Sequence, residues 1–197
     1  MSFNVLVIPE DFRKDQYILQ PIIQRLLTEC GKPNANVRVC RDPLLGGVSQ
    51  AMNRQELEEI IERYKGMVHL FLLCVDRDGE AGRRVALDKI EVWAAGEVGQ
   101  NKRFFGVDAW QELEVWVLAG HDLPDGWQWA DVRNEIHPKE LYFLPLAAAK
   151  GVTDQPGDGR HALAEEAVGR YDRIRQLCPE DVGRLERRVT DWLAAGQ

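Results

Sequence analysis

The sequence has no apolar run that approaches the roughly 20 residues a membrane-spanning helix needs, and no basic segment precedes its first apolar stretch. The opening residues, MSFNVLVIPED, are typical of a first β-strand and not of a secretory signal peptide. These absences argue against a membrane protein and against a secreted one. We expect a cytoplasmic protein without a membrane partner.

Cysteine is scarce, and the four cysteines present show no metal-binding spacing. Cys30, Cys40, Cys74 and Cys178 lie far apart, and none of them belongs to a CxxC pair. A disulfide framework or a structural zinc site normally needs several cysteines at characteristic spacings. We therefore expect free thiols buried in the core.

Positive charge is also in short supply. Lys and Arg together number 25 against 32 for Asp and Glu, which gives a net charge of −7 at pH 7. Such a chain is a poor stand-alone binder of nucleic acid, because the phosphate backbone attracts basic surfaces. A nuclease is not excluded, since Mg²⁺ and a basic partner can supply the missing charge. The phosphate-binding pattern GxxxxGK[ST] is missing as well, so this chain is not expected to hydrolyse ATP by itself.

One long apolar run is present, and it ends in a pair of carboxylates. Residues Met67–Val75 are apolar at almost every position and are followed by Asp76, Arg77, Asp78 and then a glycine. A run of this kind indicates a strand buried on both faces of a parallel sheet. Ligands bind beyond the carboxyl ends of such strands. Asp76 and Asp78 would therefore project where oxygen ligands can hold a hard cation.

The first strand has the same design. Phe3–Ile8 is apolar and leads into Pro9, Glu10 and Asp11. If the two strands are neighbours, Glu10 lies close to Asp76 and Asp78. Without a cation, three adjacent carboxylates would repel one another and raise each other's pKa. The alternative is that these acids cap the helices that follow, where the helix dipole favours negative charge.

Strands alternate with helices over residues 1–120, which predicts right-handed βαβ units, a parallel sheet and an α/β fold. Residues 121–197 are instead predicted to form a helical extension packed on this domain. The predicted strands are 3–8, 36–40, 67–75 and 104–108, and the predicted helices are 15–30, 49–65 with Ser49 as N-cap, 80–98, 111–119, 138–150, 160–176 and 179–195 with Pro179 at its start.

A glutamate after the first strand, followed by Asp-x-Asp after a buried strand, resembles the Toprim domain. The segment Gln111–Ala119 (QELEVWVLA) is similar to the QELEAWLLAD stretch of small bacterial Toprim-like proteins related to the overcoming-lysogenization-defect nucleases. The segment Tyr171–Arg188 is also similar in style to their helical tails. The resemblance implies a four-stranded parallel sheet between helices, with acids that bind Mg²⁺ or Mn²⁺ for phosphodiester chemistry.

Carried over residue by residue, the resemblance implies that Glu10, Asp76 and Asp78 are catalytic and bind metal. It adds Asp15 and Glu114 as further metal ligands. Asp15 is equally well explained as an acid at a helix N-terminus. Glu114 is either on a solvent face or directed at the cluster, and the resemblance favours the cluster.

The chain departs from the Toprim pattern at two positions. Asp11 follows Glu10 where a glycine is usual, and Gly120 stands where an aspartate commonly ends the Gln111–Ala119 segment. The first departure affects the backbone next to the predicted metal site. The second removes one ligand or helix cap, so both bear on catalytic competence.

Four basic residues are candidates for contact with a substrate phosphate. Arg83 and Arg84 follow the aspartate pair closely, although ordinary exposed helix charges explain them more simply. Lys139 and Lys150 are candidates for the cation that stabilises the transition state in such nucleases, and the sequence selects neither.

The resulting hypothesis is a Mg²⁺-dependent hydrolase of Toprim type that cleaves DNA or RNA. It would work with an ABC-type ATPase partner in phage defence or genome maintenance in bacteria. One alternative is a non-catalytic Toprim-like binding or regulatory subunit. Another is a phosphatase or nucleotide-processing enzyme that uses the same acids. Whether the chain forms a homo-oligomer is left open.

Overall fold

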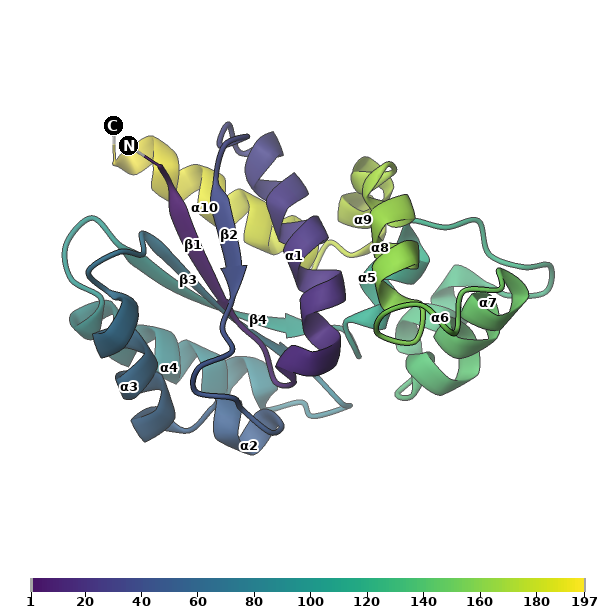
Figure 1. The fold of residues 1–197 in the computed structure, drawn as a ribbon, viewed down its shortest axis with the longest axis horizontal. Helices are drawn as coiled ribbons and strands as arrows, with labels where there is room; N and C mark the ends of the chain where they lie inside the picture. Colours follow the sequence, from purple (N-terminus) through teal and green to yellow (C-terminus); the bar gives the residue numbers. More distant parts are fainter. Residues whose placement is uncertain (1, 197) are drawn as a thin grey trace.

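In the computed structural model, which describes residues 2–196, a single sheet of four parallel strands forms the centre of the molecule. An α/β fold with a four-stranded parallel sheet flanked by helices, and with helices at the C-terminus, is thus confirmed. In spatial order the strands are β2 (Asn36–Val39), β1 (Asn4–Ile8), β3 (Leu70–Asp76) and β4 (Arg103–Ala109) (Figure 1).

Helices cover both faces of the sheet, which explains why β3 is apolar throughout. Side chains alternate along a strand, so Leu72 packs on one face and Leu73 on the other. Figure 1 shows the β2 edge, with helices on either side of it. One face is covered by α1 (Phe12–Glu29) and α10 (Val182–Ala195), and the other by α2 (Val48–Ala51), α3 (Arg54–Tyr64) and α4 (Arg83–Glu97).

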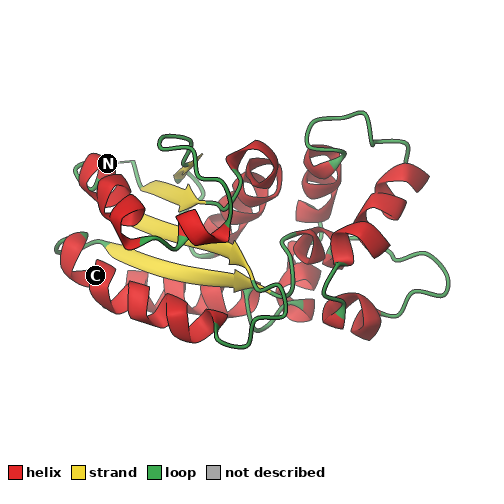
Figure 2. Cartoon of the chain, turned by 90° about the horizontal axis from the view of Figure 1, so that it is seen from below, coloured by secondary structure: helices red, strands yellow, loops and turns green. Residues whose placement is uncertain are grey.

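The remaining helices form a group beyond the carboxyl ends of the strands. Figure 2 shows the strands pointing toward this helical group. The segment predicted as a helical extension therefore contributes both most of this group and α10, which returns to the sheet. The group consists of α5 (Glu114–Ala119), α6 (Trp129–Asn134), the π-helical turn η1 (Lys139–Phe143), α7 (Leu144–Ala149), α8 (Arg160–Val168) and α9 (Tyr171–Leu177).

The predicted helix 49–65 is wrong as a single element. It is divided into α2 and α3, and the N-cap of α2 is Gly47 and not Ser49. The division occurs because the Asn53 side chain accepts hydrogen bonds from the backbone N–H groups of Gln55 and Glu56. This is the usual N-cap arrangement, and it starts a new helix at Arg54.

Three other predicted helices also differ from the structure. The predicted helix 160–176 is divided at Gly169 and Arg170, which separate α8 from α9. The last helix begins at Val182, after a turn that contains Pro179. The segment 111–119 becomes helical only from Glu114, and this shorter helix changes which glutamate can reach the end of β3.

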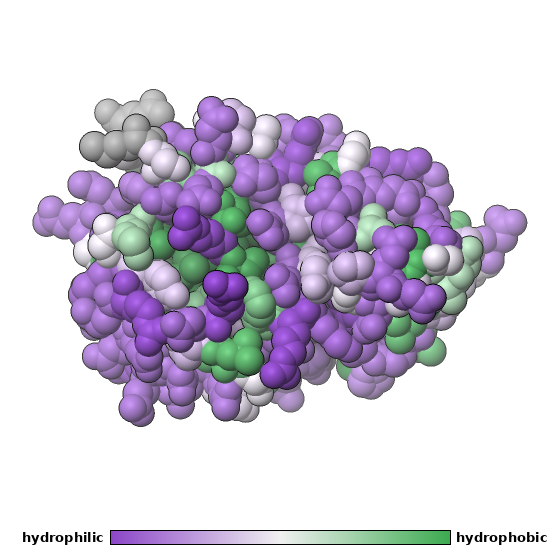
Figure 3. All heavy atoms as spheres, viewed as in Figure 1, coloured by the Kyte–Doolittle hydropathy of each residue, from purple (hydrophilic) through white to green (hydrophobic). Residues whose placement is uncertain are grey.

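The surface is largely hydrophilic on the face shown in Figure 3, and the hydrophobic areas on it include one where the β2 edge meets α3. Among the described residues, no helix is both long and apolar enough to span a bilayer. All four cysteines are free thiols, as predicted, and Cys40, Cys74 and Cys178 are buried.

Candidate metal centre

The candidate site lies where the order of the strands reverses. The chain leaves β1 toward β2 on one side and later returns to β3 on the other side of β1. In open parallel sheets, the crevice at such a switch point is where ligands bind. Glu10 follows β1 and Asp76 ends β3, so both residues border this crevice. The Asp76 backbone N–H donates a hydrogen bond to Glu10 Oε1 over 2.7 Å.

Three carboxylates come together at the end of β3. Oxygen atoms of Asp76, Asp78 and Glu112 all lie within 4.8 Å of one another. Oxygens at such separations can share one divalent cation, and carboxylates are the ligands that Mg²⁺ and Mn²⁺ favour. The arrangement of these three acids therefore fits a hard metal ion.

Backbone contacts hold the three acids in place. The Leu113 N–H donates to Asp76 Oδ1 over 2.9 Å, and the Asp78 N–H donates to the Gln111 carbonyl over 3.1 Å. Asp78 and Gly79 both have positive φ, which turns the chain sharply back after the strand. The segment before α5 is thus fixed against the end of β3, and it carries Glu112 to the aspartate pair.

Glu112 was not among the predicted site residues. The resemblance favoured a Glu114 that is directed at the cluster, and Glu112 was not weighed as a ligand. Since α5 begins only at Glu114, Glu112 lies in the preceding turn, where its side chain can reach Asp76 and Asp78. The sequence did contain a signal for Glu112, because the segment has two glutamates, Glu112 and Glu114, and either could be a metal ligand.

Glu114 is buried near Asp76, but it has a partner of its own. Arg160 on α8 donates to Glu114 Oε1 through Nε over 3.0 Å and also through Nη2. The negative charge of Glu114 still contributes to the raised pKa of Asp76, after burial itself. A role for Glu114 as a metal ligand stays a prediction, because both hydrogen bonds from Arg160 go to Oε1 and Glu114 belongs to neither group of close ligand atoms.

Asp15 is confirmed as an acid at a helix N-terminus, and its role as a metal ligand stays a prediction, because it belongs to neither group of close ligand atoms. It lies in the first turn of α1, and it accepts a hydrogen bond from the Asp11 N–H over 2.9 Å. Burial, together with the charges of Glu114 and Glu10, raises the pKa of Asp15 to about 7. Asp11 acts as the N-cap of α1 by accepting from the Arg13 N–H. Asp11 is thus a helix-capping residue, consistent with the turn at this position.

The carboxylates of the site bind protons more readily than usual. Burial, together with the charge of Asp78, raises the pKa of Glu10 from 4.5 to about 7. Burial and the neighbouring acids raise the pKa of Asp76 well above its ordinary value. Burial also raises the pKa of Glu112. Negative charge is therefore unfavourable here unless a cation offsets it.

This crowding predicts that the metal-free protein loses stability as the pH rises. In the folded state Glu10 and Asp15 hold protons up to a pKa of about 7, whereas in the unfolded chain they ionise near 4.5 and 3.8. The folded state binds more protons between these values, so the free energy of unfolding falls with increasing pH. We expect a lower Tm in EDTA at pH 8 than at pH 5. A Tm that rises over this range would contradict the crowding.

The basic candidates fall into two groups. Arg84 is occupied, since it contacts Glu91 over 2.7 Å and Asp108 over 3.2 Å, and the Lys150 ammonium lies 2.6 Å from Glu166. Arg83 lies 3.7 Å from Asp78. The Lys139 ammonium lies 3.8 Å from Glu112 Oε1, and its backbone N–H donates to Glu112 Oε2 over 2.9 Å. Arg83 and Lys139 therefore border the acidic cluster.

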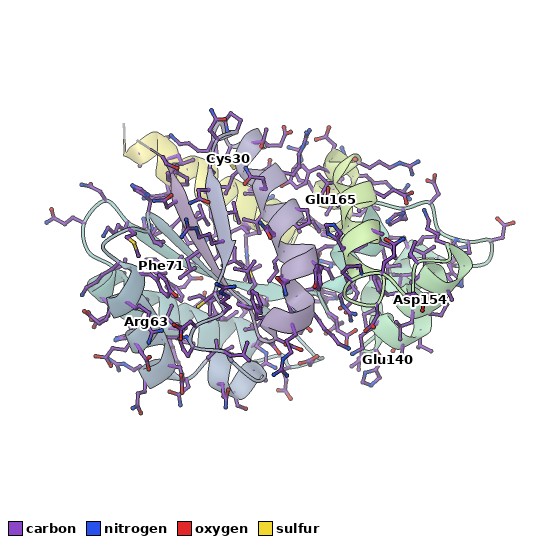
Figure 4. The ribbon with its side chains drawn as sticks, in the orientation of Figure 1. Cys30, Arg63, Phe71, Glu140, Asp154 and Glu165 are labelled. Atoms are coloured by element: carbon purple, nitrogen blue, oxygen red, sulfur yellow. The ribbon has the colours of Figure 1, made fainter. Side chains whose placement is uncertain are left out.

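Glu112 also belongs to a second group of close ligand atoms, together with His137 and Glu140. Glu140, labelled in Figure 4, lies on η1 at the lower edge of the helical group. The Lys139 ammonium lies 3.0 Å from Glu140 and already provides a positive charge for these carboxylates. The group formed by Asp76 and Asp78 with Glu112 is the better candidate for a cation, because it lies at the end of β3 beside the switch point, whereas His137 and Glu140 are exposed.

Gly120 is explained by packing. A Cβ atom at this position would lie 2.5 Å from the Ala167 Cβ and 2.6 Å from its Cα on α8. An aspartate would force α5 away from α8. The departure from the Toprim pattern thus reflects the close contact of these two helices.

Comparison with known proteins gives no assignment, because no family model, curated protein or solved structure matches the chain.

Proposed function

We propose that the protein binds Mg²⁺ or Mn²⁺ and hydrolyses phosphodiester bonds in DNA or RNA. The observation that carries this proposal is the convergence of Asp76, Asp78 and Glu112 oxygens within 4.8 Å, next to Glu10 at the switch point of the sheet. Oxygen ligands at a crevice beyond parallel strands suit a cation that also holds phosphate oxygens. The Toprim resemblance supports the same chemistry.

Asp76, Asp78 and Glu112 would hold the cation. When bound, such an ion lowers the pKa of a coordinated water and offsets charge on the leaving oxygen. Glu10 would accept the proton of the attacking water, because its carboxylate lies at the end of β1 beside Asp76. The water oxygen would form a bond to phosphorus as the bond to the leaving oxygen breaks, and the leaving oxygen would take a proton from solvent, so that the products are a phosphate monoester and a free hydroxyl. The Lys139 ammonium is placed to stabilise negative charge on the reacting phosphate.

The acidic net charge also supports a basic partner during DNA or RNA cleavage. An ABC-type ATPase in a bacterial defence or genome-maintenance system is the partner that the resemblance suggests. We propose such an assembly, in which the present chain supplies the hydrolytic site.

The test is cleavage of plasmid DNA and of single-stranded RNA in Mn²⁺, with and without EDTA. Wild type should cut only with metal, and Glu10→Gln should be inactive. Asp154→Asn, an exposed acid on the loop after α7, is the matched control and should cut normally. Metal binding without any cleavage would support the non-catalytic alternative. Phosphate release from mononucleotides without polymer cleavage would indicate a phosphatase.

Glu112 provides a separate prediction, because the sequence did not identify it. Glu112→Gln should weaken Mn²⁺ binding by at least the roughly 10- to 100-fold that loss of an outer-shell partner costs. Isothermal titration calorimetry measures this affinity. Glu140→Gln should bind Mn²⁺ as wild type does, since Glu140 belongs to the group already served by Lys139. If both variants lost the same amount of Mn²⁺ affinity, the metal would instead bind at the group formed by Glu112, His137 and Glu140.

A further inference from the structure

Arg77 stands between Asp76 and Asp78 in the chain. Unlike the other partly buried arginines of residues 2–196, it has no carboxylate within salt-bridge distance. It is only partly exposed, its Nε is buried without a hydrogen-bond acceptor, and no carboxylate of the described residues lies within 4.0 Å of its nitrogens. The other arginines that are at least partly buried each have such a carboxylate, for example Arg133 beside Asp181 and Arg160 beside Glu114. A partly buried cation without a counter-charge is unfavourable.

The Arg77 guanidinium instead lies over the indole ring of Trp110, 3.8 Å from the ring centroid. Trp110 is itself fixed, because its backbone N–H donates to Asp181 over 3.0 Å and its carbonyl accepts from Arg133 over 2.7 Å. A stacked guanidinium keeps its charge and has donors at its edge that suit phosphate oxygens. The positive charge is thus held in position although no carboxylate of residues 2–196 lies within 4.0 Å of it.

We propose that Arg77 binds a phosphate of the substrate strand next to the phosphodiester that is cut. This inference rests on the proposed function and specifies a polynucleotide as the substrate. Arg77 stands between Asp76 and Asp78 in the chain, and the Trp110 ring on which it stacks directly precedes Gln111 and Glu112. A guanidinium beside the cluster, but not in contact with its carboxylates, suits a neighbouring phosphate of the same strand. A substrate with a single phosphodiester has no such group.

The test compares Arg77→Ala with Arg103→Ala. Arg103 is exposed and lies over the ring of Phe105, 5.8 Å from its centroid, so it provides a matched stack. It begins β4 at the opposite edge of the sheet, about 20 Å along the strands from the site. Binding of fluorescein-labelled single-stranded DNA is measured by anisotropy in Ca²⁺ over a range of KCl concentrations. Hydrolysis of bis(p-nitrophenyl) phosphate in Mn²⁺ is measured in parallel, and Tm shows that each variant is folded.

Arg77→Ala should lower DNA affinity by about 10-fold and reduce the slope of log affinity against log salt by about 1. Hydrolysis of the small diester should stay within about twofold of wild type. Arg77→Lys should restore the salt slope, whereas Arg103→Ala should change neither quantity. Unchanged DNA binding in Arg77→Ala, or no DNA binding by wild type, would overturn the role of Arg77. If wild type binds DNA through Arg77 but fails to hydrolyse either substrate, the proposed catalytic function fails while the phosphate contact stands.

Discussion

Asp76→Asn should abolish metal-dependent cleavage while making the metal-free protein more stable. The Asp76 carboxylate is the central acid of the cluster, and burial together with Glu114, Glu10, Asp15 and Asp78 raises its pKa. An amide removes one negative charge from this group and retains an oxygen to accept from the Leu113 N–H. We expect a loss of roughly 100- to 1,000-fold or more in cleavage rate. In EDTA at pH 8, Tm should rise above that of wild type.

The two results are measured on the same preparations. Cleavage rates are compared in Mn²⁺, and Tm is recorded with EDTA and again with Mn²⁺. Wild type should gain Tm on adding Mn²⁺, because a ligand that binds only the folded state stabilises it. The variant should gain little. A variant that is less stable than wild type in EDTA would show that Asp76 serves the fold and not a cation.

Arg160→Met should cause the largest loss of stability of any single change considered. The Arg160 guanidinium is buried against Glu114, which is also buried and lies close to Asp76. Removing one partner of a buried pair leaves an uncompensated charge and costs about 3–5 kcal/mol. For a chain of this size, each kcal/mol corresponds to a decrease in Tm of about 2–4 °C.

A double variant separates the loss of charge pairing from the loss of packing. Glu114→Gln combined with Arg160→Met should recover much of the stability, because no unpaired charge then remains. Arg173→Ala removes an exposed contact with Asp122 and should cost at most about 1 kcal/mol. Urea denaturation at pH 8 measures all four free energies of unfolding. If Arg160→Met cost no more than Arg173→Ala, the buried pair would not be important for stability.

Local pattern was sufficient to locate the aspartate pair. The apolar run ending at Val75 predicted β3, and parallel strands place their carboxyl ends at one edge of a sheet. The same rule predicted that Glu10 lies at this edge of the sheet. In the structure, Glu10 Oε1 lies 2.7 Å from the Asp76 backbone nitrogen. This prediction depended on the assumption that β1 and β3 are neighbours, and the observed strand order confirms that they are.

Other features depend on contacts that no local pattern contains. Arg160 lies 46 residues from Glu114 in the chain, and only the packing of α5 against α8 brings them together. Glu112 entered the site because α5 starts later than its apolar pattern suggested. The break before α3 could have been predicted from the sequence, because Asn53 is a strong local N-cap signal.

The most direct test of the central claim is a crystal soaked in Mn²⁺ and measured at a wavelength where manganese scatters anomalously. The account predicts an anomalous peak within about 2.5 Å of oxygens from Asp76, Asp78 and Glu112. A peak only at His137 and Glu140, or none anywhere near the end of β3, would contradict it.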